Sequence, residues 1–154
     1  MVDPDEQQVL DHIAEYGCHV THVLEEGDLP PFAYSVGITR SSGAPELIVI
    51  GLKQPMAHFV VNEYNTRVRA GERFEPGQRA SGFLGGFDVE FRRVDRSHYR
   101  EHLGWALWLH QGIDFETLQL VYPNTSGVWP WEAESDDWFR ARQPLLDTPR
   151  TPGE

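Results

Sequence analysis

The segment 45–52, PELIVIGL, constrains the fold more than any other part of the chain. Its central residues, Leu47 to Ile50, are all apolar, so a strand here has no polar face to turn toward water. The preceding segment 32–39, FAYSVGIT, alternates instead, with Phe32, Tyr34, Val36 and Ile38 on one face. The short turn RSSGA joins the two segments. The pattern predicts neighbouring antiparallel strands, of which the second is buried at the centre of a sheet.

Two helices flank this pair of strands. Residues 3–17 open with Asp3-Pro4, which suit an N-cap and the first helical position, and they close with Gly17. Residues 53–71 predict a second helix, with Pro55 in its first turn and Gly71 at its end. Its predicted apolar face consists of Ala57, Val60, Val61, Tyr64 and Val68. A polar stripe of His58, Asn62, Asn65 and Arg69 lies beside that face, and we expect it to be solvated.

The rest of the chain completes an α+β pattern. Alternating or apolar segments predict strands over 18–26, 87–94 and 118–123. A third helix is predicted over 98–112. The segment 72–86 is rich in glycine and charge, and it predicts a loop or a short ribbon. We therefore expect one domain over 1–148, with a curved, mostly antiparallel, split-barrel-like sheet, three helices and an aromatic C-terminal strap. Residues 149–154 are expected to fray.

Composition excludes several classes of protein. The chain has 24 acidic and 13 basic residues, a formal net charge of −11, which is unlike the basic footprint of a nucleic-acid binder. The same charge disfavours adsorption to anionic lipid, and no apolar run is long enough for a membrane helix. The single cysteine, Cys18, forms no internal disulfide and is expected to be a small core residue. We expect a cytoplasmic protein.

No familiar catalytic motif stands out. His98 and His102 are four residues apart on a predicted helix, but no third ligand is evident at a fitting spacing, so no metal site is predicted. Ser35 lies in AYSVG rather than in a nucleophile elbow, and no dinucleotide-binding glycine pattern follows a strand. Catalytic residues therefore stay unassigned.

A few residues suggest a binding site rather than chemistry. Gly37 and Gly51 lie in or beside predicted strands, where glycine indicates either a bend in the sheet or the close approach of a ligand. Gln119 lies among apolar strand residues, so its amide needs a partner. Trp129 and Trp131 flank a proline, and they indicate either a strap packed over the sheet or a contact surface.

Several segments in combination resemble a known family. FAYSVGI, PELIVIGL, the RAGERF turn, LQLVYPN with the later WPWE, and QPLL are similar to the DUF4262 family, an uncharacterised bacterial domain of unknown function. The resemblance runs from about Cys18 to Leu146, with Tyr122 and Ser35 as mild departures. It implies no activity. A looser, fold-level similarity is to flavin-binding split β-barrels, which implies FMN or FAD as a cofactor and a homodimer.

Two classes of function follow as expectations. The first is binding of a small molecule or cofactor, in a site lined by Tyr34, Gly37, Arg40, Asn62, Arg92, Gln119 and Trp131, with Lys53 as a further candidate for a flavin phosphate. The alternative is a non-catalytic module, immunity-type or regulatory, that binds a protein partner through an acidic face with exposed tryptophans as anchors. Neither reading involves nucleic acid or a membrane.

Overall fold

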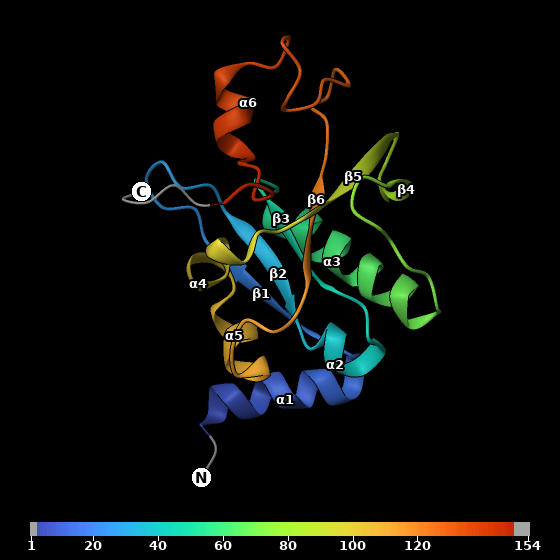
Figure 1. The fold of residues 1–154 in the computed structure, drawn as a ribbon, viewed down its shortest axis with the longest axis vertical. Helices are drawn as coiled ribbons and strands as arrows, with labels where there is room; N and C mark the ends of the chain where they lie inside the picture. Colours follow the sequence, from blue (N-terminus) through green and yellow to red (C-terminus); the bar gives the residue numbers. More distant parts are fainter. Residues whose placement is uncertain (1–2, 150–154) are drawn as a thin grey trace.

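The fold is built on one six-stranded, curved and open sheet, seen in a computed structural model that describes residues 3–149 (Figure 1). Its strands are β1 (His19–Val23), β2 (Phe32–Val36), β3 (Glu46–Ile50), β4 (Arg79–Leu84), β5 (Phe87–Arg93) and β6 (Thr117–Val121). The strand order is β1-β2-β3-β6-β5-β4, and β3 and β6 are the one parallel pair among these strands. A β1-β2-β3 meander and a β4-β5-β6 meander therefore meet at the centre of the sheet.

Helices cover both faces of the sheet. They are α1 (Pro4–Tyr16), α2 (Ile38–Ser42), α3 (Gln54–Arg69), the 3-10 turn η1 (Arg96–His98), α4 (Tyr99–His102), α5 (Gly104–His110) and α6 (Asp137–Arg142). In Figure 1, α3 lies on one side of the sheet, and α4 and α5 lie on the other. None of the described helices is long and apolar enough to cross a membrane.

The predicted central strand is confirmed. Every residue of β3 is buried, with Leu47 and Val49 in the core under α3 and Ile48 and Ile50 in the core under α4 and α5. A strand between two apolar layers must be apolar on both faces, which explains the uninterrupted run in the sequence. The fold class is thus confirmed as a single-domain α+β architecture.

The first two predicted helices are also confirmed. The Asp3 side chain accepts a hydrogen bond from the Asp5 amide at 2.7 Å, and Gly17 closes α1 in the left-handed conformation, with φ of 92°. The five residues predicted for the apolar face of α3 are all buried. The described tail runs over the sheet, and its Gln143 amide pairs with both backbone groups of Tyr122.

Other expectations need correction. The prediction that the second strand continues through Ile38 is wrong. The strand β2 ends at Val36, Gly37 turns the chain with φ of 106°, and Ile38 begins α2. The predicted third helix breaks at Leu103, whose ψ of 42° is not helical, into α4 and α5. With α2 and α6 added, the prediction of three helices is wrong. The ribbon alternative for 72–86 holds, because β4 lies there and pairs with β5. The predicted frayed tail lies outside the described residues except for Pro149.

Candidate functional site

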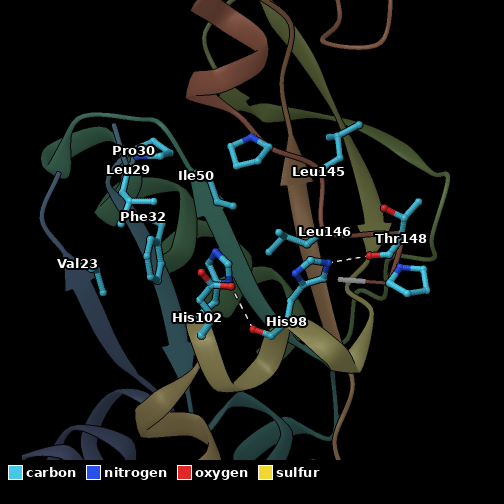
Figure 2. A pocket seen from close by; sticks show the side chains of 13 residues that line it. Val23, Leu29, Pro30, Phe32, Ile50, His98, His102, Leu145, Leu146 and Thr148 are labelled. Carbon is cyan, nitrogen blue, oxygen red and sulfur yellow. Dashed lines mark hydrogen bonds between the residues drawn. The ribbon is translucent and has the colours of Figure 1, made fainter. Parts of the chain in front are cut away.

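A pocket of about 480 Å³ lies beneath the segment 144–149, beside the ends of β2 and β3 (Figure 2). The loop between β1 and β2 forms one wall, α4 forms the floor, and the tail segment forms the opposite wall. The described lining residues are Val23, Leu29, Pro30, Phe32, Ile50, His98, Glu101, His102, Pro144, Leu145, Leu146, Thr148 and Pro149. The pocket is thus apolar on most sides and polar at α4.

Strand pairing builds the apolar wall. Phe32 on β2 is paired with Ile50 on β3, so their side chains are neighbours on the same face of the sheet. Leu146 packs on that face from the tail and is buried. At the rim, Leu29 keeps 64% of its surface exposed and Val23 keeps 37%. Apolar side chains therefore run from the core to solvent along this wall.

Gln119 fixes the tail above the pocket. This residue of β6 is fully buried, its Nε2 donates to the Pro144 carbonyl at 2.8 Å, and its Oε1 accepts from the Leu146 amide at 2.9 Å. The amide predicted to need a partner thus has two, both on the tail backbone. Gln119 acts as a support for the pocket wall rather than as a lining residue.

The polar floor comes from η1 and α4. Asp95 caps the start of η1, where its carboxylate accepts hydrogen bonds from the Ser97 amide at 3.1 Å and the Ser97 hydroxyl at 2.6 Å. These hydrogen bonds lower the pKa of the Asp95 carboxyl. His98 Nε2 lies 2.7 Å from the Thr148 carbonyl oxygen. The His102 ring packs against Phe32, with ring centroids 5.0 Å apart.

Glu101 completes a group of three that the sequence reasoning missed. One ligand-type atom from each of His98, Glu101 and His102 lies within 4.8 Å of the others. The sequence-based expectation that no third ligand lies at a fitting spacing from the two histidines overlooked Glu101. The signal was present in the sequence, because residues three and four apart share one face of a helix. Imidazole and carboxylate groups placed together can bind a cation or exchange protons.

A second pocket, of about 520 Å³, lies between α1, β1 and α3, and most of the residues that line it have polar side chains. It is lined by His12, Tyr16, Cys18, His19, Val20, His58, Asn62, Asn65, Thr66 and Arg69. The polar stripe predicted on α3 therefore lines a hollow, and its Asn65 is buried. The Asn65 Nδ2 donates to the Tyr16 carbonyl at 2.8 Å, while its Oδ1 has no hydrogen-bond partner among the described residues.

Histidines are paired around this second pocket. His12 and His19 approach to 2.8 Å between Nδ1 atoms, and His22 Nε2 lies 2.9 Å from His58 Nδ1. Burial, and secondarily the neighbouring histidines, lower the pKa of His19 and of His22. Burial raises the pKa of the nearby Cys18 thiol to about 12. The thiol is therefore protonated at neutral pH, as its predicted core role requires.

The residues predicted to line one site are dispersed over the fold. Tyr34 is buried, and its hydroxyl accepts a hydrogen bond from the Trp105 amide at 3.0 Å. Arg40 is exposed on α2, and Asn62 lines the second pocket. A Cβ on Gly37 would lie 2.7 Å from Ile13 of α1, so the close approach at this glycine comes from a helix of the chain itself.

Arg92 and Trp131 are the two predicted residues that meet. The Arg92 guanidinium lies 4.2 Å from the Trp131 ring centroid, and Arg79 lies 4.4 Å from that of Trp129. The two indoles stack at 5.1 Å, and Glu90 binds both arginines. This alternating stack fastens the loop after β6 to β4 and β5. The stack buries Trp129, which is 8% exposed, whereas Trp131 keeps 39% of its surface exposed.

Comparison with known proteins places the chain in one family. The chain belongs to the family described as Domain of unknown function (DUF4262), whose model matches residues 12–136. This confirms the resemblance seen in its sequence segments, and the match spans all six strands and α4. No curated protein and no solved structure matches the chain.

Proposed function

We propose that this member of the family binds a small molecule, with an apolar body and a polar end, in the pocket beneath the segment 144–149. The observation that carries the proposal is a cavity with an apolar wall and a single polar corner. Binding sites for small molecules typically combine apolar walls with a few polar groups that fix orientation. The volume of about 480 Å³ is in the usual range for such sites.

The two parts of the pocket suit the two parts of such a ligand. Phe32, Ile50 and Leu146 offer a continuous apolar surface that is already held in place by the sheet and by Gln119. His98 and His102 lie at the other side of the cavity. A preformed wall lowers the ordering cost of binding, because the protein need not rearrange. The dispersal of the residues predicted for a flavin site makes FMN and FAD test ligands rather than the favoured ones.

A titration tests the proposal. Metal-free protein is titrated with the fluorescent probe anilinonaphthalene sulfonate, whose aromatic body tests the apolar wall, and separately with FMN and FAD. We expect saturable binding of the probe at one site per chain. Leu145→Trp, which fills the pocket, should weaken binding at least tenfold, whereas Leu24→Trp, placed on the exposed neighbouring loop, should not. Equal binding by both variants, or no saturable binding, would overturn the proposal.

A different surface supports the alternative of a protein partner. Trp138 on α6 is 69% exposed and borders a hollow with Glu25, Gly27 and Asp28 of the β1–β2 loop. Leu24 and Leu29 in the same loop are 73% and 64% exposed. Exposed apolar residues gathered in this way mark contact surfaces, and a second copy of the chain is the partner to test first. Sedimentation should show a dimer that Trp138→Ser converts to a monomer; a wild-type monomer contradicts this alternative.

A further inference from the structure

We propose that His98, Glu101 and His102 bind one divalent transition-metal ion, of which zinc is the best fit. This inference is separate from small-molecule binding, because it concerns only the three side chains of the pocket floor. Their ligand-type atoms already lie within 4.8 Å of one another. Zinc bonds of about 2 Å place ligand atoms roughly 3.3 Å apart, so small side-chain rotations would close the group around an ion.

The local fold supplies the spacing. Asp95 starts η1, and the helical turn then continues through α4, so side chains three and four positions after His98 return to its face. Figure 2 shows the His98 and His102 side chains at the floor of the pocket, with His98 at the end of η1 and His102 on α4. Two imidazoles and a carboxylate are a zinc-type donor set, and they leave a fourth position for water or a ligand.

Backbone carbonyls orient both imidazoles for this role. A carbonyl oxygen only accepts, so His98 Nε2 must carry the proton that it gives to Thr148 at 2.7 Å, which puts the lone pair of the neutral ring on Nδ1. The His102 Nδ1 lies 3.3 Å from the His98 carbonyl, which in the same way puts its lone pair on Nε2. Carbonyl partners of this kind are the usual outer support of metal-binding histidines.

Charge and access agree with a cation. Glu101 is exposed and brings a negative charge, and the chain as a whole carries a net charge of −11. All three residues line the pocket, so an ion that they bind would lie at its edge. A bound ion would place a Lewis acid at the polar end of the pocket, next to the polar end of a bound ligand.

The test uses the full chain, freed of metal with a chelator and then titrated with Zn²⁺ and Co²⁺. We expect one ion per chain and, for Co²⁺, the intense visible absorption of a four-coordinate site. Glu101→Gln keeps the shape of an exposed side chain, and His102→Gln removes one imidazole; each should weaken binding at least tenfold with an unchanged circular dichroism spectrum. His22→Gln is the matched control, because it removes a histidine from the other cluster.

The outcomes are decisive in either direction. Loss of binding in Glu101→Gln and His102→Gln, with binding retained in His22→Gln, supports the site. Absence of binding in the parent chain, equal binding in all variants, or loss confined to His22→Gln would overturn it. Probe binding is measured on metal-free protein, so failure of the metal site and failure of the proposed function are separate results.

Discussion

The carboxylate of Glu46 and the imidazole of the half-buried His110 lie 2.8 Å apart, although Glu46 begins β3 and His110 ends α5. Glu46 is fully buried and also accepts from the Ser35 hydroxyl at 2.7 Å. The backbone amides of residues 37–39 donate to the same carboxylate over 3.0–3.3 Å. One carboxylate thus ends β2, caps α2 and fastens α5, which is how a buried charge can be tolerated here.

Glu46→Gln should destabilise the protein strongly. The substitution keeps the size of the side chain but removes its charge and replaces one acceptor with a donor, leaving buried N–H groups unpaired. We expect the free energy of unfolding to fall by about 3 kcal/mol. Urea unfolding followed by circular dichroism measures the change. Glu72→Gln, in an exposed ion pair with Arg67, is the control and should cost under about 1 kcal/mol. Equal losses in the two variants would contradict the buried role.

Gly51→Ala should lower the free energy of unfolding more than Gly71→Ala, because only the methyl group at position 51 would clash with neighbouring atoms. Both glycines have positive φ, 94° and 104°, so alanine is strained at either position. At Gly51 a Cβ would also lie 2.5 Å from the Arg142 carbonyl oxygen and 2.6 Å from the Tyr122 hydroxyl, whereas at Gly71 it would meet open space. We expect losses of about 3 and about 1 kcal/mol in thermal or urea unfolding. Similar losses would show that α6 yields to the added methyl group.

Gln119→Leu should release the wall of the pocket while leaving the sheet intact. The leucine cannot pair with the Pro144 carbonyl or the Leu146 amide, and both would lose a buried partner. We expect a loss of about 2 kcal/mol and much faster hydrogen exchange at the Leu146 amide than at amides of β3. Uniformly faster exchange across the sheet would instead show that the segment 144–148 is part of the central cooperative unit.

Cys18 should be slow to react. Burial raises the pKa of its thiol to about 12, so almost none is thiolate near neutral pH. Native protein should therefore react with a disulfide reagent many times more slowly than urea-unfolded protein, in which the thiol has its ordinary pKa. Absorbance of the released thiolate gives both rates. Comparable rates would mean that the reagent reaches the Cys18 thiol readily through the second pocket, which Cys18 lines.

Acid should weaken the fold through the paired histidines. The folded-state pKa values of His19 and His22 are below the ordinary value of 6.5, chiefly because of burial. Each therefore contributes stability that is present above pH 6.5 and is lost as pH falls through the folded-state pKa, since the unfolded chain takes up protons first. Urea unfolding above pH 6.5 and at a more acidic pH should show this loss in the free energy of unfolding, and His22→Gln should make the loss smaller. An unchanged pH dependence in that variant would contradict the assignment.

Local signals predicted the parts of the fold that are held locally. The caps of α1 at Asp3 and Gly17 and the buried run of β3 are readable because the adjoining residues determine them. The helix at Ile38 was missed because its first amides are satisfied by Glu46, a tertiary contact with no signature in its own segment. Long-range pairing decides which strands are neighbours, and the alternation of apolar and polar residues within one strand does not indicate its partners.

The candidate site was harder to predict for the same reason. Alternation placed Tyr34 and Gln119 on strand faces, but it did not indicate that α5 and the tail would cover them. The grouping of Glu101 with His98 and His102 follows from helical spacing and was available in the sequence. Its place in a pocket depends on the tail crossing above α4, which only the assembled fold provides.

The parallel pairing of β3 with β6 has a consequence for synthesis of the chain. A ribosome completes the β1-β2-β3 meander at Ile50 well before it makes Thr117, so a nascent chain holds β3 with one edge unpaired while the intervening segments emerge. That edge belongs to a strand whose residues are all buried in the folded protein, and it offers unpaired backbone groups to any other chain. Slow translation between β3 and β6 would therefore prolong the period in which neighbouring nascent chains can pair with one another, and chaperone shielding of β3 would matter most during that interval.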